Sequence, residues 1–300
     1  MSGAWMLLRP LCALLAAVFL CQSPAARALT VTDDLGVSVS FEQAPQRIIS
    51  LLPSLTETVC ALGHCHRLVG VDRDSDYPPQ VRDLPQLGGG LDPDIEAIVA
   101  LRPDVVLAAA SPAIGERLRR LGVKVVAMTP ASHADVQRVL LKTGRLLATA
   151  DAHKVWRAMQ AGVDAAAQSL PPSSRGMRVY FEVNQGPYAA SEASFIGETL
   201  SRLGVKNIVP AALGAFPKLN PEYVVRANPD LIMIGQSNPQ SLARRPGWLQ
   251  IRAVREQRVC TFTPQQANIL VRPGPRMGEA ARLMAACLGA RALTAEETKP

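Results

Sequence analysis

The amino-acid sequence predicts an α/β protein with two Rossmann-like lobes, each built on a parallel sheet, and one long backbone helix joining them. Three observations support this fold class. Apolar, β-branched runs of strand length alternate with helical stretches, the alternation restarts after Pro172, and a short helix-turn-strand segment occurs twice. Parallel strands need helical crossovers between them, so this alternation indicates sheets covered by helices.

The predicted strands form two groups along the chain. The first group contains RIISLL, LVGV, DVVLAA and KVVAM, at 47–52, 68–71, 104–109 and 124–128. The second group contains RVYFEV, NIV, DLIMIG and RVCTF, at 178–183, 207–209, 230–235 and 258–262. We therefore expect an N-terminal lobe at 46–131, a C-terminal lobe at 177–290 and a tail at 291–300.

The segment between the lobes, 132–170, has the apolar period of a helix. It opens with a cap-like signal at Ser132 and Asp135 and stops at two prolines. A single helix of about 38 residues would be roughly 55 Å long, which is enough to cross both lobes. Gly144 and Gly162 offer an alternative in which the segment forms two helices.

Two internal repeats suggest that the lobes are related. IEAIVALRPDVVLA and PEYVVRANPDLIMIG match Glu96 with Glu222 and share a Pro-Asp pair before an apolar run. In the same order, TETVCALG and GETLSRLG match Glu57 with Glu198. Two matches in one order favour a pseudo-symmetric, two-lobed protein over chance similarity between short helix-strand segments.

The first residues read as a secretory signal peptide, at 1–28. An arginine precedes an apolar run of about ten residues, and Ala26-Arg27-Ala28 offers a cleavage site. The run is shorter than the roughly 20 residues that span a bilayer. We therefore expect a periplasmic protein.

The formal charge of +7 falls when the signal peptide leaves, since two arginines and no acid are removed. The remaining charges are scattered, without a Lys/Arg block or interleaved aromatics. This pattern is typical of a solvated basic surface and argues against a nucleic-acid partner.

The cysteines of the mature chain predict disulfides. Cys60, Cys65, Cys260 and Cys287 remain after cleavage, an even number in an oxidising compartment. Of the three possible pairings, closeness in sequence favours Cys60 with Cys65, and a strand followed by a closing helix suits Cys260 with Cys287. The alternative is a metal site in CALGHCH, but its spacing matches no common zinc pattern, so we predict no metal site.

A ligand is expected in the cleft where the strand C-termini of both lobes meet, since open α/β sheets bind ligands there. Aromatic and polar residues in segments that follow the strands are the candidates. Aromatic residues make up only 4% of the chain, which gives those on such loops more weight. Arg272, before a Pro-Gly pair, has an equally good interpretation as a bridge between loops. The ligand-binding candidates are Tyr77, Tyr188, Phe216, Asn268 and Arg272.

Catalytic motifs do not explain this sequence. It contains no G-x-S-x-G elbow, Walker loop, GxGxxG or HExxH, and its histidines do not stand beside a credible nucleophile. A binding protein without covalent chemistry is the prediction, and an exported α/β enzyme is the alternative from another class.

Four segments carry a resemblance to a known family: RIISLLPSLTETVCALG, LVGVDRDSDYPPQV, IEAIVALRPDVVLA and RPGWLQIRAVREQRV. They resemble periplasmic substrate-binding proteins of ABC importers for cobalamin, haem and iron-siderophores, and among these the cobalamin-binding proteins most closely. The resemblance covers Pro45 to about Ala290. It implies two α/β lobes with a single backbone helix between them, a corrinoid ligand with haem or a ferric siderophore as the alternative, and no resident cofactor.

The resemblance also implies a partner and roles for particular residues. In this family a glutamate on each lobe meets arginines of the paired membrane subunits, and Glu96 and Glu222 match those positions. A monomer delivering its ligand to a permease dimer in the inner membrane is therefore expected. Both glutamates also suit a simpler role, because an acid is favoured at the start of a helix.

The tyrosines, Phe216 and Arg272 fall where cobalamin-binding relatives contact the corrinoid. Two positions depart from that pattern. Gly90 stands where a tryptophan is found in the best-known relative, and Asn268 stands where an acid is found. The departures bear on which ligand is bound more than on the class of protein.

Overall fold

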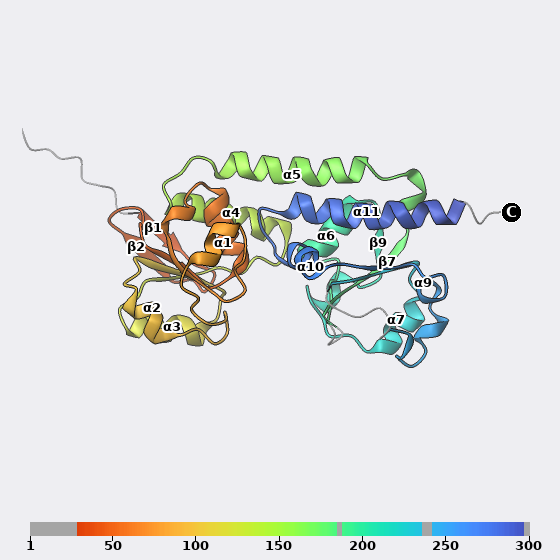
Figure 1. The fold of residues 1–300 in the computed structure, drawn as a ribbon, viewed down its shortest axis with the longest axis horizontal. Coiled ribbons are helices and arrows are strands. Elements are labelled where there is room, and N and C mark those ends of the chain that lie inside the picture. The colour runs from red at the N-terminus through yellow and green to blue at the C-terminus, as the bar shows by residue number, and fades with distance from the viewer. Residues whose placement is uncertain (1–28, 185–187, 236–241, 297–300) are drawn as a thin grey trace, which may run out of the picture.

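The computed structural model describes residues 29–184, 188–235 and 242–296. Figure 1 shows two α/β lobes side by side, with the long helices α5 (Ala152–Gln168) and α11 (Met277–Glu296) along one side of the molecule. The predicted fold class of two lobes with parallel sheets is confirmed. The predicted signal peptide at 1–28 lies outside the described residues. Within those residues, no helix has the length and apolar character needed to cross a membrane.

The N-terminal lobe is built on a parallel sheet with the strand order β4-β3-β5-β6. Each strand lies within one of the predicted apolar runs and is almost completely buried, as expected for a sheet covered on both faces. The strands are β3 (Ile48–Ser50), β4 (Leu68–Val71), β5 (Val105–Ala108) and β6 (Val125–Ala127). The helices are α1 (Pro53–Ala61), α2 (Ile95–Ala100) and α3 (Pro112–Arg120).

An antiparallel hairpin that the sequence analysis missed precedes this sheet. Its strands are β1 (Leu29–Thr32) and β2 (Ser38–Phe41). The Asp33 carboxylate accepts a hydrogen bond from Arg119 of α3 at 2.7 Å, and Val31 is buried. The hairpin therefore packs on the N-terminal lobe, ahead of the boundary predicted at residue 46.

The C-terminal lobe has the strand order β11-β10-β7-β8, with β9 also paired to β7. All pairings are parallel except that of β8 with β7. The predicted strand at 207–209 overlaps β9 only at Asn207, and β8 was not predicted. The strands are β7 (Arg178–Asn184), β8 (Tyr188–Ala189), β9 (Lys206–Asn207), β10 (Leu231–Ile234) and β11 (Val259–Thr261). In the described part of this lobe, the helices besides α11 are α6 (Phe195–Arg202), α7 (Pro221–Ala227), α9 (Arg252–Arg255) and α10 (Pro264–Val271).

The link between the lobes is two helices, so the prediction of one helix over 132–170 is wrong. α4 (His133–Leu146) begins at a capping box formed by Ser132 and Asp135 and ends at Leu146, and α5 begins only at Ala152. Between them Ala148 adopts a left-handed backbone conformation, with φ of 55°, which a continuous helix does not allow. The break therefore lies after Gly144, and Gly162 sits inside α5. With 17 residues, α5 is about 25 Å long.

Gly162 has a packing role instead of a helix-breaking one. A Cβ atom placed on it would lie 3.0 Å from the Cα of Gly278 on α11, so the two glycines allow the helix backbones to approach closely. α11 itself continues to Glu296, so the predicted boundary between lobe and tail at 290 falls inside a helix.

The longer sequence repeat is a structural repeat. A residue with positive φ follows each helix: Arg102, two residues after the end of α2, with φ of 47°, and Asn228, directly after the end of α7, with φ of 44°. Asp104 and Asp230 follow, and each carboxylate accepts a backbone N–H bond at the start of its lobe's first sheet strand, at 2.8 and 2.9 Å. The conserved spacing thus ties each outer helix to the sheet in the same way.

Both predicted disulfides are confirmed. Cys60 at the end of α1 is bonded to Cys65, and Cys260 of β11 is bonded to Cys287 of α11. Because both sulfurs of CALGHCH are in a disulfide, they are not thiolate ligands, which removes the basis of the metal alternative. The described residues also form 3₁₀ helices: η1 (Cys65–Arg67), η2 (Pro79–Asp83), η3 (Pro172–Ser174), η4 (Ala211–Leu213) and η5 (Trp248–Gln250).

Candidate functional site

A cleft lies where the C-terminal ends of strands from both lobes converge, as the fold class predicts. Its apolar part is a cavity of about 260 Å³. Leu52, Ala109 and Thr129 follow strands of the N-terminal lobe, and the opposite wall comes from the C-terminal lobe. The residues lining this part are Leu52, Ser54, Ala109, Thr129, Pro130, Val183, Phe195, Ile196, Phe216, Val271 and Pro273.

The polar part of the cleft is a neighbouring cavity of about 510 Å³. It shares Leu52, Ser54, Val271 and Pro273 with the apolar part, so the two form one continuous cleft at the start of α1 and the end of α10. The remaining lining residues are Pro53, Arg73, Asp74, Asp76, Asn268 and Arg272. One cleft thus offers an apolar surface beside a strongly charged one.

A groove of about 620 Å³ between β1 and α4 is a weaker candidate. Arg138 and Lys142 line it, but both form ion pairs with Asp34, at 3.1 Å for Lys142. Burial opposes ionisation of Asp34, yet its bonds to the Thr129 N–H and to these two cations lower its pKa overall. Since these cations are already paired within the protein, we place the ligand site at the strand ends.

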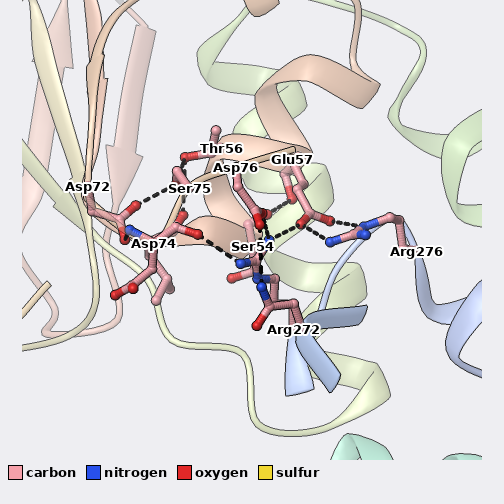
Figure 2. Close-up of polar contacts among 12 residues, drawn as sticks. Ser54, Thr56, Glu57, Asp72, Asp74, Ser75, Asp76, Arg272 and Arg276 are labelled. Atoms are coloured by element: carbon pink, nitrogen blue, oxygen red, sulfur yellow. Dashed lines mark hydrogen bonds and ion pairs between the residues drawn. The ribbon is translucent and has the colours of Figure 1, made fainter. Parts of the chain in front are cut away.

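The Glu57 carboxylate lies behind the polar part of the cleft and is only 3% exposed. It accepts hydrogen bonds from Arg276 at 2.8 Å to Nε and 2.5 Å to Nη2, and from Arg272 Nη1 at 3.2 Å (Figure 2). A buried carboxylate is stable in its charged form only when it is paired and hydrogen-bonded in this way. Two guanidinium groups from the C-terminal lobe thus reach α1 of the N-terminal lobe.

Arg272 also binds the loop that follows β4. Its Nη1 donates to Asp76 at 2.6 Å and its Nη2 donates to the Asp74 carbonyl at 2.8 Å. Burial favours the neutral form of Asp76, but the bond and charge of Arg272 outweigh it and lower the pKa of Asp76. Of the two interpretations of Arg272, the bridge between loops is realised, and the same side chain lines the cleft.

The same loop is fixed to α1 by a buried chain of hydroxyl groups. Ser75 donates to the Asp72 carboxylate at 2.5 Å, and the hydroxyls of Ser75 and Thr56 lie 2.8 Å apart (Figure 2). Burial raises the pKa of Asp72, and the bond from Ser75 lowers it only in part. The loop that carries Asp74, Asp76 and Tyr77 is therefore held firmly.

The predicted aromatic residues are not all in one place. Phe216 lines the apolar part of the cleft, with its ring 5.8 Å from that of Phe195. Tyr77 and Tyr188 are each 42% exposed, and among the described residues neither lines the two cavity parts. Tyr77 packs beneath the guanidinium of Arg276, and Tyr188 pairs with Lys218 in a β-bridge.

Gly90 has a steric reason to lack a side chain. A Cβ atom on it would lie 2.9 Å from the carbonyl oxygen of Leu51, which precedes the cleft residue Leu52. The loop backbone therefore approaches the cleft more closely than a larger residue would allow. The path of this loop therefore leaves no space for a tryptophan side chain at position 90.

Glu96 and Glu222 are both exposed in the first turns of their helices. Figure 1 shows α2 and α7 on the side of the molecule away from α5, one on each lobe. Caps from Asp94 and Asn220 satisfy the helix starts independently of the glutamates. The side chains of the two glutamates are thus available to a partner.

Sequence reasoning missed the charged residues that build the polar part of the cleft: Glu57, Asp74, Asp76 and Arg276. Signals were present for three of them, and the first is that Glu57 is the matched acid in the shorter repeat. The acids of VDRDSDYPP also stand directly after a strand, where cleft residues are expected.

Two α/β lobes with a cleft between the ends of their sheets define a two-lobed binding protein. Residues 48–266 match the family model described as periplasmic binding protein, so the chain belongs to that family. Membership confirms the prediction of a binding protein in place of an enzyme and confirms the resemblance on which it rested.

Individual relatives agree with this assignment. The chain is 27% identical to the ABC transporter substrate-binding lipoprotein YvrC of Bacillus subtilis, over 84% of this chain and 82% of that protein. It is 30% identical to a cobalamin-binding protein of Halobacterium salinarum, over 70% of this chain and 59% of that protein. Its structure is similar to that of the periplasmic haem-binding protein BhuT with two haems, with a TM-score of 0.70 and 26% identity, covering 82% of this chain and 98% of that one.

Proposed function

We propose that this chain binds a corrinoid such as cobalamin in the interlobe cleft and delivers it to the permease of an ABC importer. The choice of ligand rests on one observation: the arginines that line the polar part of the cleft already form ion pairs within the protein. Arg73 is paired with Asp92, and Arg272 is paired with Glu57 and Asp76. Arg272 is buried, so its release to an anionic ligand would break a buried ion pair, whereas the Arg73–Asp92 pair is exposed and weak.

Carboxylate oxygens remain available in the same place. The Asp74 side chain lines the cleft and is exposed, and Figure 2 shows its carboxylate pointing away from the arginines. Acceptors of this kind suit a ligand edge that offers N–H donors, as the primary amides around a corrin ring do. The apolar part with Phe216 suits the flat ring itself.

Haem is the first alternative, supported by the structural similarity to a haem-binding protein. The two propionates of haem would need cations, and those lining the polar part are paired. An exposed tyrosine, Tyr77 or Tyr188, would have to serve as the axial ligand. A ferric siderophore, the second alternative, usually needs several free basic groups, so the corrinoid is favoured on charge.

Delivery would use Glu96 and Glu222 as charged contacts to two equivalent membrane subunits, since each lobe presents one of them. The signal peptide at 1–28 would bring the protein to the periplasm, where it would act as a monomer. The pseudo-symmetric placement of α2 and α7 supports this two-point contact.

Calorimetric titration of the mature protein with cyanocobalamin, with haem titrated in parallel, tests the ligand. We expect one-to-one binding of cyanocobalamin and weaker or no binding of haem. Binding of haem alone would move the assignment to haem uptake. If neither cyanocobalamin nor haem binds, the corrinoid proposal is overturned and ferric siderophores become the next ligands to test.

A further inference from the structure

The ring of Tyr77 has one face covered by a cation. The guanidinium carbon of Arg276 lies 4.2 Å from the ring centroid, within the range of a cation–π contact. Tyr77 does not itself line the cavity, but it directly follows Asp76, which lines the polar part of the cleft, and it is 42% exposed, so the remainder of the ring is open to solvent beside that part. The covered face fixes the plane of the ring, and the open part is free to meet a ligand.

Arg276 is itself held by Glu57. Two of its nitrogens bond the two carboxylate oxygens of Glu57, at 2.8 and 2.5 Å, in the fork geometry that fixes a guanidinium in plane and position (Figure 2). The Glu57 carboxylate is buried, and its second arginine, Arg272, holds it from another side. The order of contacts is therefore carboxylate, guanidinium, aromatic ring.

This stack crosses between the lobes. Glu57 and Tyr77 belong to α1 and to the loop after β4, whereas Arg276 directly precedes α11. Gly274 brings that segment against α1, because a Cβ atom on it would lie 3.4 Å from the carbonyl oxygen of Ser54, a cleft residue. The orientation of an N-terminal-lobe aromatic is thus set by a C-terminal-lobe arginine.

We infer that Arg276 and Glu57 are positioning residues for ligand binding, which act by holding the Tyr77 ring in the orientation that stacks on the ligand. This inference rests on the proposed corrinoid function and identifies residues that serve it without touching the ligand. It predicts that the contribution of Arg276 to affinity disappears when the ring of Tyr77 is absent.

A double-mutant cycle with cyanocobalamin tests the inference. We expect Tyr77→Leu to weaken binding about tenfold and Arg276→Gln to weaken it about threefold to fivefold. In the Tyr77→Leu background, Arg276→Gln is expected to cause no further loss, since the ring it positions is gone. Glu57→Gln is expected to behave like Arg276→Gln, and Arg276→Lys, which keeps the charge but not the fork, to lie between it and the wild type.

Arg202→Gln is the matched control, because the guanidinium of Arg202 in α6 bonds Gln160 and Asp164 of α5 rather than Tyr77 or Glu57. It should leave affinity unchanged. Equal losses from Arg276→Gln with and without the Tyr77 ring would overturn the inference, as would full affinity in Arg276→Gln or Tyr77→Leu. If Arg276→Gln does not fold, Arg276→Lys carries the same cycle. A wild-type protein that binds no cyanocobalamin would instead refute the proposed function.

Discussion

Glu57 and Glu198 occupy matching positions on α1 and α6, and each accepts hydrogen bonds from the start of a helix beyond its own lobe's sheet. Glu57 binds Arg276 before α11, and Glu198 accepts a hydrogen bond from the backbone N–H of His133 at the start of α4. The shorter sequence repeat therefore marks two of the places where the lobes are fastened to each other.

Removing the Glu57 carboxylate is expected to destabilise the protein strongly. Glu57→Ala leaves Arg272 and Arg276 buried without their shared partner, which typically costs about 3–5 kcal/mol. Equilibrium unfolding in urea would measure the loss. Glu192→Ala removes an exposed carboxylate and serves as the control, with an expected change within about 0.5 kcal/mol. A loss below about 1 kcal/mol for Glu57→Ala would show that the arginines find other partners.

The second interlobe contact predicts a pH dependence. Burial lowers the pKa of His133, and the neighbouring Glu198 opposes that shift only in part. The ring Nε2 lies 2.9 Å from the Thr199 hydroxyl and 3.1 Å from the Phe195 carbonyl. Because the folded state prefers the neutral imidazole, its contribution to stability is complete above the ordinary pKa of 6.5 and is lost as the pH falls below it.

Thermal unfolding between pH 7.5 and about pH 5 would measure this effect. We expect the wild type to lose more stability over this range than His133→Gln, whose side chain does not titrate. His64, whose pKa is also lowered by burial, is present in both proteins and cancels in the comparison. Parallel pH curves for the two proteins would contradict the assignment.

Most of the parallel strands were predictable because they are buried on both faces, which favours a continuous run of apolar residues in the sequence. The hairpin at β1 and β2 was missed because it has only one buried face and follows directly on the predicted signal peptide. The break between α4 and α5 was only the alternative to a single helix, for a different reason. Ala148 takes a left-handed conformation that sequence rules assign to glycine or asparagine.

Sequence reasoning named Arg272 but not its network with Glu57, Asp76 and Arg276, because most of these residues are distant from one another in the chain. Glu57 and Arg276 are 219 positions apart, and nothing near either residue indicates the other. The aromatic candidates were selected from the loops that follow strands, and this rule located Phe216 in the cleft. It gave no information on which face of Tyr77 would be covered.

Helix packing between α5 and α11 predicts opposite effects for two glycine substitutions. Gly162→Ala places a Cβ atom 3.0 Å from the Cα of Gly278, so the helices must separate, at a cost of about 1–3 kcal/mol. Gly289→Ala on α11 meets nothing within 4 Å and should stabilise the helix by up to about 1 kcal/mol. Urea unfolding of both variants checks the signs. A stabilised Gly162→Ala protein would show that the helix contact is looser than the structure indicates.

Replacing both exposed glutamates, Glu96 and Glu222, by lysine is expected to abolish delivery of the ligand while leaving its binding intact. Glu96 and Glu222 lie on separate lobes at helix starts already capped by Asp94 and Asn220, so the folded structure does not depend on them. Placing lysines there would set like charges against the arginines expected on the permease. Uptake of labelled cyanocobalamin by cells relying on the double variant should fall at least about tenfold.

Calorimetry on the same variant separates docking from binding, since affinity for cyanocobalamin should stay within about twofold of the wild type. Glu116→Lys makes the same charge change on the exposed surface of α3 and should leave uptake unaffected. A lysine in the first turn of a helix costs up to about 1 kcal/mol against the dipole, so the glutamine variants are needed as well to exclude a stability effect. Normal uptake with the protein that carries both lysines would show that Glu96 and Glu222 only stabilise the starts of their helices.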